Sequence, residues 1–190
     1  MESLFTPWRY GWVTSPRKPR GCLFCTVQKA RRDGPGNWVL YRGRDNFVIL
    51  NLFPYNNGHL MVVPNRHVRS LSRLKSEQLQ EMMDLVRVCE KALRRLYRPQ
   101  GFNLGMNLGK CSGAGIESHL HMHLVPRWAG DTNFLSVMNG TRILPEALSS
   151  TFRKLRKAIR QDLDPVAGHS ATSSGKPKQR PASRRKAFRT

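Results

Sequence analysis

The stretch His119-Leu120-His121-Met122-His123-Leu124-Val125 dominates this sequence. Histidine alternates with apolar residues, and the side chains of a β-strand point alternately to opposite faces. A strand here would place three imidazoles on one face and pack its apolar residues on the other. One histidine on such a face is common in half-buried strands, whereas three in register favour a chemical role. A single metal ion held by all three rings is an alternative, because imidazole is a common zinc ligand.

The rest of the pattern predicts an α+β fold. Short apolar stretches bounded by turn residues predict strands, and apolar residues three and four positions apart predict amphipathic helices. The long helix has Ser76 as its expected N-cap and Pro99 just beyond its end. Because hairpin-linked strands precede a helix and further strands, we expect an antiparallel sheet of about five strands with one long and one C-terminal helix. The predicted strands span residues 38–42, 47–52, 59–63, 102–108 and 119–126, and the predicted helices span residues 76–97 and 145–161.

Two of the four cysteines form a C-x-x-C pair, Cys22 and Cys25. A disulfide is disfavoured in a chain without an export signal. A redox motif would open a helix after a strand, and nothing apolar enough precedes Cys22. Zinc is the better interpretation, but the pair supplies only two of four ligands. We therefore predict a structural tetrahedral zinc site that His67 and His119 complete.

The segment before the histidine stretch is rich in glycine. Its glycines allow backbone N–H groups to approach an anion closely. Beside a row of imidazoles, and with Asn107 and Lys110 in the same segment, this pattern favours a phosphate held where a histidine can attack it. A glycine-rich hairpin loop without a ligand is the alternative. The glycines are Gly105, Gly109, Gly113 and Gly115.

The charge of the chain is strongly basic and unevenly distributed. The 190 residues carry a formal net charge of +21. Seven Lys and Arg but no acidic residue fall in residues 165–190, where Ser, Gly and Pro predominate, so we predict a disordered basic tail. An arm over residues 1–20 and a catalytic domain over residues 21–164 precede it. The domain's remaining charge suits an anionic substrate, and the tail suits either weak nucleic-acid binding or solubility.

No membrane or export segment is evident in the sequence. There is no run of 18 apolar residues, and the first residues lack the basic and apolar regions of a signal peptide. We therefore expect a cytoplasmic protein without membrane association.

The histidine stretch resembles the H-x-H-x-H-x-x motif of the histidine triad (HIT) superfamily of nucleotide hydrolases and transferases. The similarity extends to residues 46–51, to residues 57–64 and to the C-x-x-C pair. Pro7-Trp8-Arg9-Tyr10 and the segment of residues 126–134 are similar to the bacterial branch of diadenosine tetraphosphate phosphorylases, also termed ATP adenylyltransferases. The resemblance covers roughly residues 4–160 and implies the HIT fold.

The resemblance implies nucleotidyl transfer through a covalent intermediate on the middle histidine, His121. A neutral imidazole attacks the α-phosphorus of a dinucleoside polyphosphate, and a second acceptor resolves the nucleotidyl-imidazole. Inorganic phosphate as acceptor gives phosphorolysis, and water gives hydrolysis. By the same resemblance His123 assists the leaving group, and His119 orients the nucleophile or binds zinc.

The resemblance also assigns binding residues and an assembly. It implies that Asn107, Gly115 and Ser118 hold the α-phosphate, that Asn51 holds the ribose, and that residues 47–50 border the base. In zinc-bearing branches the ligands match Cys22, Cys25, His67 and His119, in agreement with the spacing argument. Many members carry Gln-Ser or Gln-Thr before the triad, where this chain has Glu117-Ser118. Members are commonly dimers, and Met82 and Met83 on the long helix belong either to that interface or to the core.

Two alternative functions follow from the same residues. One is another HIT hydrolase, acting on dinucleoside polyphosphates with water or on nucleoside phosphoramidates. The other belongs to a different class: a non-catalytic nucleotide- or nucleic-acid-binding protein, for which the basic tail is the main support.

Overall fold

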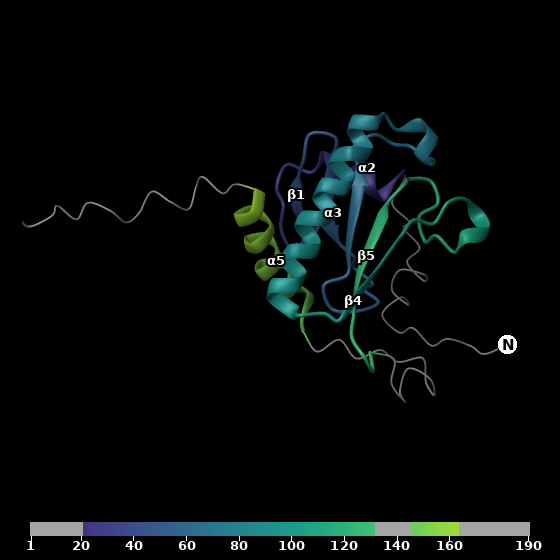
Figure 1. Ribbon diagram of the computed structural model, residues 1–190. Coiled ribbons are helices and arrows are strands. Elements are labelled where there is room, and N and C mark those ends of the chain that lie inside the picture. The colour runs from purple at the N-terminus through teal and green to yellow at the C-terminus, as the bar shows by residue number, and fades with distance from the viewer. Residues whose placement is uncertain (1–20, 132–145, 164–190) are drawn as a thin grey trace, which may run out of the picture.

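The structure is a computed structural model that describes residues 21–131 and 146–163. The predicted arm over residues 1–20 and the predicted tail over residues 165–190 lie outside the described residues, as do residues 132–145. Among the described helices, none has the length and apolar character needed to span a bilayer. The described residues form one α/β unit, with helices on both faces of a sheet (Figure 1).

The centre of the fold is a five-stranded antiparallel sheet, as the sequence predicted. Its strand order is β1-β2-β3-β5-β4, so β5, which carries the third triad histidine, lies inside the sheet between β3 and β4. In this position His123 pairs with Met61 on one side and with Gly105 on the other. The strands are β1 (Val39–Arg42), β2 (Asn46–Leu50), β3 (Leu60–Pro64), β4 (Gly101–Gly105) and β5 (Met122–Arg127).

Two clusters of buried residues pack on the two faces of the sheet. Helices α3 (Ser76–Tyr97) and α5 (Leu148–Leu163) cover one face, where Val48, Leu60 and Leu124 lie in the larger cluster. The short helix α2 (Leu23–Lys29) covers the other face through Phe24, in a smaller cluster with Phe47 and other residues. Alternation along β2 and β3 separates the clusters, since neighbouring residues of a strand face opposite layers. His123 shares its side with Met61, so the histidine row lies on the α2 side.

Both predicted helices are present, with small differences at their ends. The long helix spans Ser76–Tyr97 as predicted, but its N-cap is Lys75 and not Ser76. The Gln78 side chain accepts a hydrogen bond from the Lys75 backbone N–H at 3.0 Å, which satisfies the helix start from within the first turn. The C-terminal helix spans Leu148–Leu163, so the prediction of residues 145–161 began too early, because residues 146 and 147 are described and are not helical.

All five strands differ from the prediction by one to three residues at an end, and three of these differences have identifiable reasons. The first strand begins at Val39 and not at 38, because Trp38 has a left-handed backbone with φ of 58°. The fourth strand ends at Gly105 and not at 108, where its pairing with His123 ends. The fifth strand begins at Met122 and not at 119, because the Leu120 backbone N–H donates to Val68 O, beyond the end of β3.

The helix α2 was not predicted. Cys22 is the N-cap, and residues 23–29 form two helical turns. A helix of seven residues is too short to be stable alone and depends on tertiary contacts. Arg42 supplies some of these contacts, because its guanidinium donates to the carbonyls of Val27 and Gln28 at the end of the helix. Two 3₁₀ turns, Leu71–Arg73 and Lys110–Ser112, complete the described elements.

Candidate active site and metal centre

His121 is oriented by a hydrogen bond from its own ring to the main chain. Its Nδ1 lies 2.8 Å from the carbonyl oxygen of His119. A carbonyl oxygen only accepts, so Nδ1 of His121 carries the proton and Nε2 carries a free lone pair. The side chain is buried, and burial lowers the pKa of His121 below its ordinary value. The ring is therefore neutral at pH 7, with a nucleophilic nitrogen in a defined direction.

A second chain of hydrogen bonds assigns the proton of His123. The backbone N–H of Tyr55 donates to Nδ1 of His59 at 3.1 Å, so the His59 proton lies on Nε2. That Nε2 lies 2.9 Å from Nδ1 of His123, which must accept. A neutral His123 therefore carries its proton on Nε2. Burial, with His121 alongside, lowers the pKa of His123 to about 4, so the neutral form prevails at pH 7.

The two rings are neighbours with opposite proton arrangements. The ring centroids of His121 and His123 lie 4.7 Å apart, at an interplanar angle of 73°. His121 presents an unprotonated Nε2 and His123 a protonated one. This pair suits a nucleophile beside a hydrogen-bond donor for the leaving group.

Phe24 packs against the rings of His119 and His121. It is 1% exposed, and its ring centroid lies 5.5 Å from that of His119 and 5.1 Å from that of His121. Because Phe24 stands between the two cysteines in sequence, the segment that carries the thiols also carries the surface that packs against His121.

Four ligating side chains from three segments meet next to this row. One ligand atom from each of Cys22, Cys25, His67 and His119 lies within 4.8 Å of all the others. Nδ1 of His119 is 3.3 Å from Cys22 Sγ and 3.6 Å from Cys25 Sγ, and Nδ1 of His67 is 3.3 Å from Cys25 Sγ. The helix α2, the loop after β3 and the segment before β5 each contribute.

The donor set fits a tetrahedral zinc ion. Zn–S bonds of about 2.3 Å and Zn–N bonds of about 2.0–2.1 Å imply S···N edges of about 3.6 Å, close to the separations found here. The His119 Nε2 donates to Pro64 O at 2.9 Å, which leaves Nδ1 unprotonated toward the thiols. Burial and the neighbouring Cys22 raise the pKa of the Cys25 thiol, a cost that a bound cation would offset.

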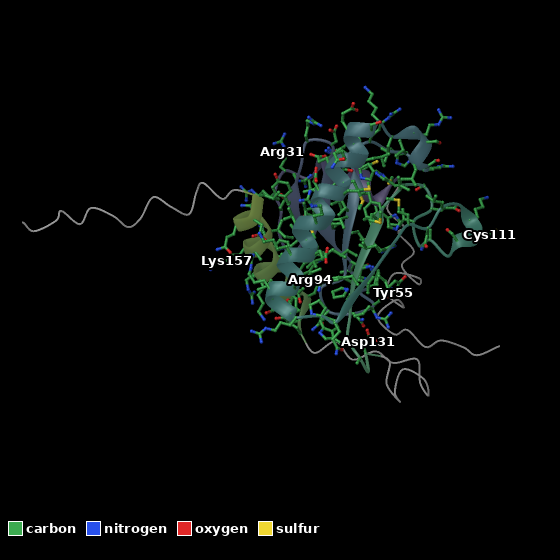
Figure 2. The ribbon with its side chains drawn as sticks, in the orientation of Figure 1. Arg31, Tyr55, Arg94, Cys111, Asp131 and Lys157 are labelled. Carbon is green, nitrogen blue, oxygen red and sulfur yellow. The ribbon has the colours of Figure 1, made fainter. Side chains whose placement is uncertain are left out.

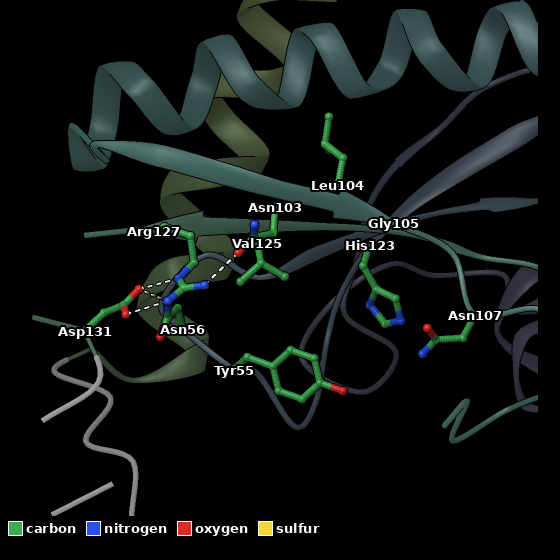
Figure 3. Close-up of a pocket in the computed structure, with 10 residues that line it drawn as sticks. All are labelled: Tyr55, Asn56, Asn103, Leu104, Gly105, Asn107, His123, Val125, Arg127 and Asp131. Atoms are coloured by element: carbon green, nitrogen blue, oxygen red, sulfur yellow. Dashed lines mark hydrogen bonds and ion pairs between the residues drawn. The ribbon is translucent and has the colours of Figure 1, made fainter. Parts of the chain in front are cut away.

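A pocket of about 340 Å³ has the His123 side chain in its lining (Figure 3). Residues of β4 and β5 line it, and Asn107 lies close to the His123 ring at one end. At the other end Arg127 donates to both carboxylate oxygens of Asp131, at 2.5 and 2.8 Å, and to Asn103. The pocket therefore has one end at the candidate leaving-group donor and the other closed by an ion pair.

Comparison with known proteins agrees with this arrangement. A family model described as "HIT domain" matches residues 36–130, which is half of the chain. The chain belongs to the HIT domain family. The matched segment includes the whole sheet and all three triad histidines, whereas Cys22 and Cys25 precede it.

Two relatives of this HIT domain carry names that describe an activity. It is 43% identical over 117 residues to "AP-4-A phosphorylase" of Mycobacterium tuberculosis, covering 62% of this chain and 60% of that protein. It is 29% identical over 96 residues to "Bis(5'-nucleosyl)-tetraphosphatase [asymmetrical]" of Schizosaccharomyces pombe, covering 50% of this chain and 52% of that protein. The chain thus spans between half and two thirds of the length of these curated relatives.

A solved structure has the same fold and contains zinc. It is described as a Zn-bound histidine triad family protein from Mycobacterium smegmatis, with a TM-score of 0.61 and 27% identity. The comparison covers 76% of this chain and 96% of that one. The predicted HIT fold is confirmed by this likeness.

The HIT domain brings some predicted site residues together and leaves others apart. The four predicted zinc ligands meet, and Asn107 joins His123 in the pocket. Asn51 turns its amide toward His59, with Nδ2 3.2 Å from Nδ1 of that ring. Gly115 and Ser118 lie in the loop before His119, outside the pocket lining. Their contacts with a nucleotide stay predictions. Of the two helix methionines, Met82 is in the core, while Met83 is 44% exposed.

Sequence reasoning missed His59 and Phe24. The sequence analysis gave His59 no role, yet it is fully buried and hydrogen-bonded to His123. Its position directly before β3, whose strand neighbour is β5, was the available signal. Phe24 carried no signal, because the helix around it was not predicted.

Proposed function

We propose that this HIT domain cleaves dinucleoside polyphosphates by nucleotidyl transfer through His121, with phosphorolysis as its principal reaction. The observation that carries the proposal is the pairing of an unprotonated Nε2 on His121 with a protonated Nε2 on His123, at a centroid distance of 4.7 Å. The 43% identity to a protein named AP-4-A phosphorylase favours this substrate class.

The first step forms one bond and breaks another. Nε2 of His121 attacks the α-phosphorus, and the bond from that phosphorus to the bridging oxygen breaks. The departing nucleotide leaves as a phosphate anion that accepts a hydrogen bond from the Nε2–H of His123, and His59 holds His123 from the other side of the ring. The His121 Nδ1–H remains on the His119 carbonyl, which stabilises the positive charge that develops on the ring.

The second step transfers the nucleotidyl group. Inorganic phosphate or water attacks the phosphorus from the side the leaving group vacated and releases its proton to solvent. The bond between phosphorus and Nε2 of His121 breaks, which restores a neutral His121. With diadenosine tetraphosphate, phosphate as acceptor yields ADP and ATP, while water yields AMP and ATP. Amide and backbone donors at Asn107, Gly115 and Ser118 are the proposed partners of the α-phosphate, and Asn51 that of the ribose.

We also propose that Cys22, Cys25, His67 and His119 hold a structural zinc ion. The donor set, the separations of 3.3–3.6 Å and the tautomer of His119 support this. Zinc would supply a crosslink between α2, the loop after β3 and the segment that carries the triad. The reaction itself uses only the side chains described above.

A homodimer is a further part of the proposal. In the described sheet β4 is an edge strand, with Leu104 51% exposed, and unpaired edges favour association. Size-exclusion chromatography with light scattering measures the mass directly.

The deciding experiment is phosphate dependence. Protein is incubated with diadenosine tetraphosphate with and without inorganic phosphate, and products are separated by anion exchange. ADP formed only with phosphate supports the phosphorylase. AMP and ATP formed regardless of phosphate assign the hydrolase. No cleavage of this compound, with turnover of adenosine phosphoramidate, would replace the proposed substrate class.

A further inference from the structure

We propose that the outer face of α5, together with the loop after α2, binds the phosphate backbone of nucleic acid independently of the histidine site. Figure 2 shows Arg31 and Lys157 on the side of the molecule where α5 lies, and Tyr55 and Cys111 on the opposite side. A partner on the α5 face would therefore leave the pocket open to nucleotides.

Three cations form one stripe along the helix. Arg153, Lys157 and Arg160 are spaced by four and three residues, so they share a face. A rise of 1.5 Å per residue separates them by about 6 and 4.5 Å along the axis. All three are exposed. Phosphates recur about every 3.4 Å of axis along one strand of duplex, so a stripe about 10.5 Å long spans about three phosphates of a nucleic acid.

These cations have no acidic partner among the described residues. The acidic side chains near α5 form ion pairs with other cations. Asp162 pairs with Arg95 and Lys91, and Glu146 pairs with Lys154. The stripe therefore presents uncompensated charge, in contrast to the ion-paired outer face of α3, where Arg87 pairs with Asp84.

The loop after α2 extends the stripe. Nη1 of Arg156 donates to Asp33 O at 3.1 Å, which ties the loop to α5. The preceding residues Arg31 and Arg32 are exposed and likewise have no acidic partner in the described part of the chain. In sequence, α5 leads directly into residues 165–190 with their seven Lys and Arg. The described cations on this side of the fold thus come from two adjoining segments, α5 and the loop after α2.

The chemistry of the face favours nucleic acid over a membrane. The apolar side of α5 is occupied in the core, where Phe152, Leu155 and Ile159 are at most 4% exposed. The helix therefore has no apolar face to insert into lipid, which interfacial helices require. Guanidinium and ammonium groups alone suit phosphates, and such binding is independent of base sequence and sensitive to salt.

The test is fluorescence anisotropy of the full chain with a labelled 20-nucleotide single strand and a 20-base-pair duplex, from 50 to 300 mM KCl. We compare R153Q/K157Q/R160Q with R69Q/R73Q/K75Q, which removes the same charge from the loop after β3 and the start of α3. We expect the α5 variant to bind about tenfold more weakly at 100 mM salt. Its slope of log K against log salt for the single strand should fall by about two, since each lost phosphate contact removes about 0.7.

Further arms separate the alternatives. Saturating AMP should not displace the oligonucleotide, and displacement would place the binding in the histidine pocket and overturn the proposal. Equal weakening in both triple variants would show a net-charge effect and overturn it as well. A second background is the full chain with its tail cations replaced by Gln. If adding the α5 changes to that protein leaves its affinity for the oligonucleotide unchanged, the proposal is also overturned.

Vesicles containing one third phosphatidylserine test membrane binding. Binding to these vesicles without binding to oligonucleotides would overturn the proposal. Cleavage of diadenosine tetraphosphate should stay unchanged in the α5 variant, so this result is separate from the proposed reaction.

Discussion

The carbonyl oxygen of His119 accepts a hydrogen bond from Nδ1 of His121 at 2.8 Å, and the ring of the same His119 faces the thiols of the candidate metal centre. His119 thus belongs to two candidate sites: its main chain contacts His121, and its side chain contacts the candidate metal ligands. Any movement of the His119 backbone changes the direction of the His121 lone pair.

Replacing His121 should abolish turnover without unfolding the protein. His121→Ala removes the nucleophile, and we expect kcat to fall by at least about a thousandfold, in the range seen when covalent catalysts lose their nucleophile. Circular dichroism and the melting temperature serve as the folding control. Wild-type protein incubated with α-labelled substrate and quenched in alkaline denaturant should carry label, because the P–N bond is stable in alkali, and the variant should not. Retained turnover in His121→Ala would contradict the mechanism.

Removing His59 should slow departure of the leaving group. His59→Phe keeps a ring but loses the donor to Nδ1 of His123, so His123 no longer holds its proton in the required position. We expect kcat to fall by about 10- to 100-fold, as for the loss of a hydrogen bond of roughly 1–3 kcal/mol. An AMP ester of p-nitrophenol needs little proton donation and should be affected less than threefold.

A double-mutant cycle checks that interpretation. In a His123→Ala background, His59→Phe should cause no further loss of kcat, since both act through one proton. Additive losses would assign His59 a separate role.

Disrupting the metal centre should lower both stability and turnover. In Cys22→Ser we expect loss of the bound zinc, measured by inductively coupled plasma mass spectrometry. Because the ion would tie α2 to the triad segment, the melting temperature should fall by roughly 10 °C, which for a chain of this size corresponds to about 3 kcal/mol. The control is Cys111→Ser, an exposed cysteine outside the cluster. One equivalent of zinc retained in Cys22→Ser would refute the site.

The buried histidines should destabilise the fold in mild acid. The folded-state pKa of His123 is depressed to about 4, below the ordinary value near 6.5. Between these values the unfolded state binds a proton that the folded state does not, so stability is full above pH 6.5 and declines as the pH falls toward 4. Melting temperatures in this window should fall less steeply for His123→Asn. Parallel slopes in the two proteins would show that His123 is not the titrating group.

Gly58 should tolerate no side chain. It has φ of 76°, and an added Cβ would lie 2.7 Å from Cδ2 of Leu93. Gly58→Ala combines a left-handed backbone with a clash in the core and should cost about 1–3 kcal/mol. Gly101→Ala is the matched control, because nothing lies within 4 Å of its added Cβ. Chemical denaturation measures both, and an equal effect of the two changes would be the contrary result.

The agreement between sequence and structure is best where a pattern repeats. The helix over residues 76–97 was predicted to the residue, because six turns of apolar spacing leave little freedom. The helix α2 was missed because seven residues hold too little periodicity, and its stability comes from Arg42 and from the core contacts of Phe24. The start of the triad strand was misplaced, because the partner of Leu120 is the Val68 carbonyl and not a strand.

The sequence by itself determined which residue types are available for chemistry, since the three alternating histidines and the C-x-x-C pair are local patterns. Tertiary structure alone decided how that chemistry is oriented. The proton on His121 depends on a carbonyl two residues away, and the proton on His123 depends on His59, which is 64 positions distant and adjacent only through the pairing of β3 with β5. Residue types are local properties, whereas the tautomer of an imidazole is set by whichever groups the fold brings within hydrogen-bonding distance.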